Sequence, residues 1–166
     1  MTDQKQTFTG STNDIKIEVA QDSDLPQVLA IWQQGLKENF PDMEISQAAI
    51  EIFINNFKNR KQSFNFWVAK ETSVLGWCSI LPAFSHPLKK NYSGEVSTYI
   101  DEEKAPKGLG TRLMKYAFRE IQKTEIENVW GFANTGNLRS IKMCKNAGMY
   151  VCGNTIKKII LVIEFE

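Results

Sequence analysis

The chain has few of the residues from which metal sites and disulfide frameworks are built. Its 166 residues contain one histidine, His86, and three cysteines, Cys78, Cys144 and Cys152. A histidine-rich metal site would need ligands that the chain does not have, and the cysteines lack the Cys-x-x-Cys spacing of structural zinc sites. The odd number of cysteines argues against a disulfide framework. A protein without disulfides fits the reducing cytoplasm. We therefore expect no metal and a cytoplasmic location.

The charges and the apolar runs exclude further classes of protein. The chain has 20 Lys and Arg against 19 Asp and Glu, a net charge of +1, whereas a general nucleic-acid binder shows a basic excess. No apolar run reaches the roughly 18 residues that span a bilayer, and the polar first ten residues do not predict a signal peptide. We expect residues 1–13 to form a flexible tail and residues 14–166 a single domain, with no nucleic-acid or membrane partner.

Hydrophobic periodicity predicts an α+β fold with a mixed sheet of about seven strands and about four helices. The predicted strands are residues 15–20, 64–70, 74–83, 95–100, 128–133, 149–153 and 159–165. The predicted helices are one capped by Asp22 or Ser23 that ends before residues 39–42, and those at residues 46–57, 109–123 and 138–146. A short turn makes strands 64–70 and 74–83 an antiparallel hairpin, whereas the helix between strands 95–100 and 128–133 makes that pair parallel.

The most informative segment runs from Glu95 to Met114. A β-branched run breaks off into a charged loop, which is followed by Gly108-Leu-Gly110 and an amphipathic helix. The N–H groups at such a helix start form a cradle for phosphate or pyrophosphate. A lone Gly-x-Gly also fits an ordinary turn, but the strand before it, the helix after it and Asn137 some thirty residues later favour phosphate binding. The absence of Gly-Lys-Ser/Thr argues against a P-loop NTPase.

The order of these elements and two motifs resemble the GNAT superfamily of acetyl-CoA-dependent N-acetyltransferases over residues 14–166. The family pattern Gln/Arg-x-x-Gly-x-Gly reads Ala105-Pro-Lys-Gly108-Leu-Gly110, and the helix pattern Asn-x-x-Ser…Tyr…Gly-Phe reads Asn137-Leu-Arg-Ser140, Cys144 and Gly148-Met149. Within the superfamily the chain resembles the phosphinothricin and methionine sulfoximine acetyltransferase branch. That branch is matched by residues 81–84, 89–92 and 95–100.

The resemblance implies acetyl transfer from acetyl-CoA, the co-substrate, to the primary amine of a small amino-acid-like acceptor. The amine would attack directly in a ternary complex, and the protein would be a homodimer. Two alternatives stay open. One is an acetyltransferase that acts on a protein or peptide amine, and the other is a CoA-binding module without catalysis.

The resemblance also assigns roles to residues. Glu95 would be the general base, and Tyr99 and Cys144 would be candidate proton donors. A β-bulge near Tyr99 or Ile100 would expose a backbone N–H to the oxyanion. The cofactor would be bound by Tyr99, Ile100, Lys107, Gly108, Leu109, Gly110, Thr111, Arg112, Asn137 and Ser140. The acceptor would be bound by Phe40, Met43, His86, Tyr92 and Glu95.

The chain departs from the family pattern at three positions. Ala105 stands at the Gln/Arg position, Pro106 lacks an N–H, and Cys144 replaces the tyrosine of the last helix. Several assignments have a structural alternative. Glu95 and His86 could be solvated surface groups, Tyr99 and Cys144 could pack in the core, and Asn137 could only cap its helix. The aromatic residues Trp32, Phe53, Phe57 and Trp67 are expected in the core rather than in a substrate pocket.

Overall fold

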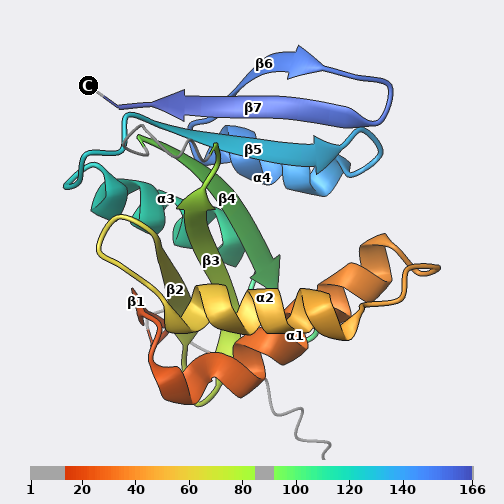
Figure 1. Cartoon of the computed structure of the whole chain (residues 1–166), viewed down its shortest axis with the longest axis vertical. Coiled ribbons are helices and arrows are strands. Elements are labelled where there is room, and N and C mark those ends of the chain that lie inside the picture. The colour runs from red at the N-terminus through yellow and green to blue at the C-terminus, as the bar shows by residue number, and fades with distance from the viewer. Residues whose placement is uncertain (1–13, 85–91, 166) are drawn as a thin grey trace, which may run out of the picture.

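The computed structural model describes residues 14–84 and 92–165, in which one mixed sheet carries helices on both faces (Figure 1). The expected tail, residues 1–13, and His86 lie outside the described residues. Within the described ranges there are seven strands and four α-helices, as the periodicity predicts. The strands are β1 (Lys16–Val19), β2 (Asn65–Lys70), β3 (Val74–Pro82), β4 (Ser93–Ile100), β5 (Asn128–Asn134), β6 (Tyr150–Asn154) and β7 (Lys158–Glu164). The helices are α1 (Leu25–Asn39), α2 (Gln47–Lys58), α3 (Leu109–Ile121) and α4 (Leu138–Asn146).

The strands lie in the order β1-β2-β3-β4-β5-β7-β6. Every neighbouring pair is antiparallel except β4 and β5, which are parallel. The expected β2–β3 hairpin and the parallel crossover through α3 are therefore both confirmed. Figure 1 shows α1 and α2 over the β1–β4 part of one face, and α3 and α4 against the other face.

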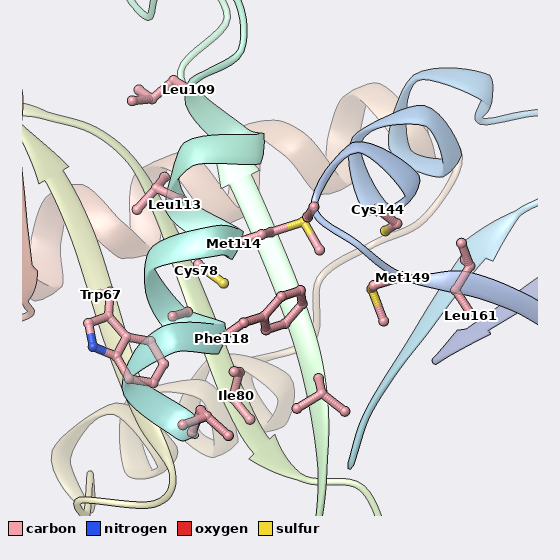
Figure 2. Close-up of a cluster of buried hydrophobic side chains, with 14 of the residues drawn as sticks. Trp67, Cys78, Ile80, Leu109, Leu113, Met114, Phe118, Cys144, Met149 and Leu161 are labelled. Carbon is pink, nitrogen blue, oxygen red and sulfur yellow. The ribbon is translucent and has the colours of Figure 1, made fainter. Parts of the chain in front are cut away.

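The helix α3 is amphipathic, and its apolar side forms the centre of the larger core. Leu113, Met114 and Ala117 have no exposed surface, whereas Lys115 and Arg119 on the opposite side are exposed. Figure 2 shows the apolar side chains of α3 between Trp67 of β2 and the region of Cys144, Met149 and Leu161. Burial of a large apolar side chain contributes about 1.5–3 kcal/mol, so this face fixes α3 against the sheet.

A second core lies between α1, α2 and the other face of the sheet. Phe57 is fully buried and Phe53 stacks on Trp32 with the ring centroids 4.5 Å apart. The indole N–H of Trp77 donates to the carbonyl of Val28 at 3.0 Å, which ties α1 to the middle of β3. These rings pack inside the fold, as does Trp67 in the larger core. The expectation that the aromatic residues are core residues is confirmed.

Helix ends were predicted with mixed success. Asn137 caps α4, because its Oδ1 accepts a hydrogen bond from the amide of Ser140 at 3.0 Å, and Gly148 ends that helix with a φ of 105°. The cap expected at Asp22 or Ser23 is wrong, because Asp22–Asp24 form a 3-10 turn and α1 begins after it. Asp22 instead forms an ion pair with Arg60 at 2.7 Å, a partner that is distant in the sequence.

The strands β4 and β5 pair over a short stretch and then diverge. Only Ser93–Glu95 is paired with Asn128–Trp130. Beyond these residues, β4 continues along β3 and β5 continues along β7, and Figure 1 shows the two strands separating. The backbone edge of Val96–Ile100 that faces β5 therefore has no strand partner among the described residues.

The β-bulge expected near Tyr99 or Ile100 is not present. The β3–β4 register runs without a shift from Gly76 opposite Ile100 to Pro82 opposite Gly94. The divergence of β5 gives β4 a free backbone edge without an inserted residue. A bulge is therefore unnecessary for exposing amides at this strand.

Candidate active site

The two glycines of the Gly-x-Gly pair are needed for different reasons. Gly108 has a φ of 84°, in the left-handed region, and a Cβ there would meet nothing within 4 Å. Its requirement is conformational, since left-handed backbone strains other residues. Gly110 is buried, and a Cβ there would overlap the sulfur of Met143 on α4. Its requirement is space, because the start of α3 packs closely against α4.

The start of α3 presents open backbone amides. The amide of Leu109 bonds to the carbonyl of Pro106 at 3.3 Å, and that of Arg112 bonds to Gly108 at 3.1 Å. Four amides close to them have no backbone acceptor in the described ranges: those of Lys107, Gly108, Gly110 and Thr111. Unpaired N–H groups and the positive end of the helix dipole favour an anion at this place.

The basic side chains of this region are available to an anion. Lys107 and Arg112 are exposed, and neither forms an ion pair within the part of the chain that is described. The Leu109 side chain is 1% exposed and therefore cannot contact a bound anion. Thr111 is partly buried. The open amides and the two exposed cations could hold a pyrophosphate or phosphate group.

The loop that leads to α3 is held by Asp101. This residue is buried, and its carboxylate accepts hydrogen bonds from the amides of Glu103 and Lys104 at 3.2 and 3.3 Å. Its carbonyl accepts from the amide of Ala105 at 2.9 Å. The Ala105 side chain packs against the larger core. The position of the family's Gln or Arg therefore contributes packing rather than a polar group.

Asn137 joins α4 to the end of α1. Besides capping α4 through its Oδ1, it donates from Nδ2 to Oδ1 of Asn39 at 3.1 Å. Asn39 in turn donates to the carbonyl of Gly35 at 2.7 Å. Both polar atoms of Asn137 are thus engaged. Capping is confirmed, and Ser140 is placed in the first turn of α4 next to this link.

Glu95 lines a hollow on the side of the sheet that carries α1 and α2. The hollow has a volume of about 380 Å³ and is lined by Asn56, Leu81, Pro82, Glu95 and Ser97. Burial raises the pKa of the Glu95 carboxyl above its usual value. A carboxylate with a raised pKa is a stronger base than an ordinary glutamate. Its position suits the removal of a proton from a group bound in the hollow.

Tyr99 lies on the same face of β4 as Glu95 but is packed between α1 and β3. Its ring stacks on Trp77 with the centroids 5.0 Å apart, and a Cβ at Gly35 would lie 2.5 Å from the ring. Burial raises the pKa of its hydroxyl, an effect that a hydrogen bond with Trp32 partly offsets. Four residues of extended strand place Tyr99 about 13 Å from Glu95 along β4. Core packing accounts for this position.

Ile100 points to the opposite face, toward the start of α3. A Cβ on Gly110 would lie 3.5 Å from Cγ1 of Ile100. Ile100 packs against the larger core. The end of β4, the start of α3 and α4 therefore meet at this point, as the expected cofactor residues require.

Cys144 is 6% exposed and belongs to the larger core, where Figure 2 shows it close to Met149. Burial raises the pKa of its thiol, and hydrogen bonds that involve its own backbone and Ser140 partly offset this rise. The thiol is therefore protonated at neutral pH, which disfavours a thiolate nucleophile. Cys78 nearby is fully buried, and burial raises the pKa of its thiol to about 12.

The residues expected to bind the acceptor are not all brought together. Phe40 and Met43 are 37% and 44% exposed in the α1–α2 connection and do not line the hollow of Glu95. Tyr92 is 41% exposed directly before β4. His86 falls outside the described residues. Of this group, Glu95 alone is placed in the hollow.

Four lining residues were missed by sequence reasoning: Asn56, Leu81, Pro82 and Ser97. Ser97 follows Glu95 by two residues and therefore shares its face of the strand, a signal that was present in the sequence. Asn56 carried no such signal. It adjoins the buried stripe marked by Phe53 and Phe57, but its approach to β4 depends on how α2 packs on the sheet.

Residues 15–150 match the family described as the acetyltransferase (GNAT) domain. The chain belongs to this family of N-acetyltransferases. The GNAT fold, with its mixed sheet and four helices, and the expected superfamily are therefore confirmed. The open amides at the start of α3 and the diverging strands β4 and β5 lie within the matched residues.

The chain is similar to acetyltransferases whose names give different acceptors. YwnH of Bacillus subtilis, which is provisionally named a phosphinothricin acetyltransferase, is 26% identical over 134 residues, covering 80% of this chain and 82% of YwnH. The crystal structure of a phosphinothricin acetyltransferase from Sinorhizobium meliloti in complex with acetyl-CoA has a TM-score of 0.73 at 13% identity, covering 92% of this chain and 89% of that one. A ribosomal-protein-alanine N-acetyltransferase from Brucella melitensis has a TM-score of 0.75 at 20% identity, covering 90% and 99%. The last two likenesses show the shared fold.

The described residues hold neither a metal cluster nor a helix that could span a membrane. They contain no group of three or more His, Cys, Asp or Glu side chains placed to hold a metal ion. None of their helices combines the length and the apolar character that a membrane span requires.

Proposed function

We propose that the chain transfers the acetyl group of acetyl-CoA to the primary amine of a small amino-acid-like acceptor of the phosphinothricin or methionine sulfoximine type. The observation that carries the proposal is the position of Glu95. It lies in a hollow of about 380 Å³ and at the last paired position of β4 and β5. Glu95, the proposed base, thus lies in the hollow proposed for the acceptor and directly precedes the free backbone edge of β4.

The residues of the chain fit acetyl-CoA as a co-substrate. The open amides and exposed cations at the start of α3 would hold its pyrophosphate, and the free edge of β4 offers backbone partners for the amide groups of pantetheine. Acetyl-CoA would supply an acetyl group activated as a thioester. Lys107, Gly108, Gly110, Thr111 and Arg112 are the residues that we propose for the phosphate end.

Glu95 would bring the acceptor amine to its reactive form. Alkyl amines have a pKa near 10 and are mostly protonated at neutral pH. The Glu95 carboxylate would take one proton, directly or through a water, and leave the nitrogen lone pair free for attack. The nitrogen would then bond to the carbonyl carbon, and collapse of the resulting oxyanion would break the C–S bond, with the sulfur keeping the electron pair. The nitrogen would lose its second proton, which would pass to the leaving sulfur directly or through a water. A backbone N–H on the free edge of β4 would stabilise the oxyanion.

Direct attack requires no acetylated cysteine. The buried, protonated state of Cys144 supports a packing role, and the stacked position of Tyr99 supports the same for its ring. We propose that neither side chain touches the reacting atoms. Each polar atom of Asn137 makes one hydrogen bond, and its second Nδ2 hydrogen and second Oδ1 lone pair would be used in the pantetheine contact that we propose for Asn137 and Ser140.

We also propose a homodimer formed through the uncovered face of β5, β7 and β6. Trp130 and Phe132 of β5 lie opposite Val162 and Ile160 of β7; Phe132 is 42% exposed, whereas Val162 is buried. β7 carries Lys158 at one end of this face and Glu164 at the other. Neither forms an ion pair within the described ranges, although Lys158 donates to Oδ1 of Asn134 and Glu164 accepts from the hydroxyl of Tyr150. Two copies related by a two-fold axis would place each lysine near the partner's glutamate.

The free cysteines, Cys78, Cys144 and Cys152, support a cytoplasmic setting for this reaction. Residues 14–166 are proposed as one catalytic domain.

The dimer is tested by sedimentation, with Phe132→Lys expected to give a monomer.

The reaction is tested by release of CoA thiol from acetyl-CoA in the presence of a panel of amines. The panel contains methionine sulfoximine, phosphinothricin, free amino acids, polyamines, aminoglycosides and a lysine peptide. We expect turnover on an amino-acid-like acceptor that is lost in Glu95→Gln and kept in Glu127→Gln, a matched change at an exposed glutamate. Turnover on the lysine peptide alone would favour a protein amine as the acceptor.

The alternative of a CoA-binding module without catalysis has one specific support. Ala105 packs in the core and Cys144 is buried, so two polar groups of the family pattern have no counterpart. This alternative predicts that acetyl-CoA raises the melting temperature while no amine is acetylated. It further predicts that Glu95→Gln leaves acetyl-CoA binding unchanged.

A further inference from the structure

The hollow beside β4 contains one charged side chain and two neutral polar ones. Glu95 and Ser97 come from β4 and Asn56 comes from α2, whereas Leu81 and Pro82 provide an apolar wall. Among the described lining residues, the Glu95 carboxylate is the charged group and no cation is present. The neutral groups can still donate hydrogen bonds, through the amide N–H groups of Asn56 and the hydroxyl of Ser97.

These polar side chains have no partner among the described residues. Neither Asn56 nor Ser97 nor Glu95 makes a side-chain hydrogen bond or an ion pair with any other residue of the described structure. Other asparagines of the same helix region behave differently, since Nδ2 of Asn59 donates to Oδ1 of Asn55 at 2.8 Å. Partly buried polar groups usually find a partner. Asn56, Glu95 and Ser97 line one hollow without a partner among the described residues, an arrangement that suits the binding of a polar ligand.

We infer that Asn56 and Ser97 bind the carboxylate of the acceptor, while Glu95 binds its amine. This inference rests on the proposed function and deepens it. The Glu95 carboxylate attracts an ammonium group and repels an anion. The acidic end of an amino acid must therefore lie away from Glu95, and among the described lining residues the side-chain donors are Asn56 and Ser97.

The spacing along β4 fits an α-amino acid. Glu95 and Ser97 are two residues apart on one face of a strand, which separates their Cα atoms by about 7 Å. An amine and a carboxylate on neighbouring atoms can bridge this distance with a hydrogen bond at each end. Asn56 approaches from the opposite wall, where its amide can donate to the same carboxylate. The hollow would thereby select amino acids over simple amines.

The test compares an amino acid with the amine that lacks its carboxyl group. Methionine sulfoximine and its decarboxylated amine are the first pair, and the other amino acids of the panel are paired in the same way. We expect Asn56→Ala and Asn56→Leu to lower kcat/KM for the amino acid by about 10- to 100-fold, mainly through KM, because hydrogen bonds to charged groups are strong. The decarboxylated amine should change by less than about 3-fold. Asn56→Asp should act more strongly against the amino acid, and Ser97→Ala more weakly.

Asn55→Ala is the matched control, because Asn55 is exposed on another side of α2. It should leave both substrates and the KM for acetyl-CoA within about 2-fold. Retained turnover of the decarboxylated amine shows that a variant is folded. The inference is overturned if the Asn56 variants affect both substrates equally, or if the unmodified protein acetylates only amines without a carboxyl group. No turnover on any amine would instead refute the proposed function itself.

Discussion

Glu95 lies opposite Trp130 at the last position where β4 and β5 are paired. The next residue of β4, Val96, already follows β3 alone, and its Cγ1 lies 3.6 Å from where a Cβ on Gly131 would be. Along β4, the candidate base therefore lies between the segment that is paired with β5, which precedes it, and the open strand edge, which follows it. Rigid strands place a catalytic group more accurately than loops do.

Replacement of Glu95 by glutamine should separate activity from stability. Loss of a general base should lower kcat by about 10²- to 10⁴-fold. Burial raises the pKa of Glu95 in the folded protein, so the carboxyl favours folding while it is protonated at low pH and loses this contribution as the pH rises through the raised pKa. Glu95→Gln removes the cost of a partly buried charge. We expect the variant to melt above the unmodified protein at pH 7 and at the same temperature below pH 4.

The same raised pKa predicts the pH profile of the unmodified enzyme. The acid limb of kcat/KM should lie above the range of an ordinary glutamate, since the base acts only when it is ionised. A profile without an acid limb above about pH 4.5 would contradict Glu95 as the base.

Gly110→Ala should disturb the contact between α3 and α4. The added methyl group would overlap the sulfur of Met143. Because a methionine side chain can move, we expect a loss of about 1 kcal/mol in the free energy of unfolding, at the low end for overpacking. Met143→Ala in the same chain should recover part of this loss. Chemical denaturation of the unmodified protein, the two single variants and the double variant measures the coupling. Additive losses would show that the two residues do not interact.

Asn137 has two roles that substitutions can separate. Asn137→Ala should cost about 1 kcal/mol of stability, as expected for loss of an N-cap. Asn137→Ser keeps a capping oxygen but loses the Nδ2 donor to Asn39. If Asn137 also binds acetyl-CoA, Asn137→Ser should raise the KM for acetyl-CoA, whereas Asn39→Ala should not. Equal KM values in both variants would restrict Asn137 to the helix cap and its link to α1.

Cys144→Ala should affect stability more than catalysis. The side chain is buried among apolar residues, so its truncation should cost about 1 kcal/mol. A protonated packing residue predicts a kcat within about 3-fold of the unmodified enzyme. Cys152→Ala, at an exposed position, is the control for loss of a thiol. A fall in kcat that is specific to Cys144→Ala, with loss of an alkaline limb that the unmodified enzyme shows, would instead identify the thiol as a proton donor.

The parts of the fold that local sequence determines were predictable. The period of apolar residues defined α3, and the Gly108-Leu-Gly110 motif marked its start, because each signal lies within a few residues of the feature that it specifies. Asp22 was misassigned as a cap because its partner Arg60 is remote in the sequence. The prediction of a bulge in β4 was wrong because the free edge of β4 arises from the course of a separate strand, β5.

The candidate site was predictable along β4 and not across the hollow. Glu95 could be identified from its motif, and Ser97 could have been from the alternation of the strand. Asn56 could not, because nothing local distinguishes it from Asn55 or Asn59. Its assignment depends on the packing of α2 through Phe53 and Phe57, which brings one of several polar side chains over β4.

The short seam between β4 and β5 has a consequence for how the protein folds. The strands β1–β4 form one antiparallel unit and β5–β7 form another, and three residue pairs join them. The β2–β3 and β6–β7 hairpins close small loops, whereas the seam must wait for α3 to cross over. We expect the seam to form last and to open first, with the amides of Ser93–Glu95 exchanging hydrogen faster than those in the middle of β3. Function would then be acquired at the final step of folding, when two stable halves meet.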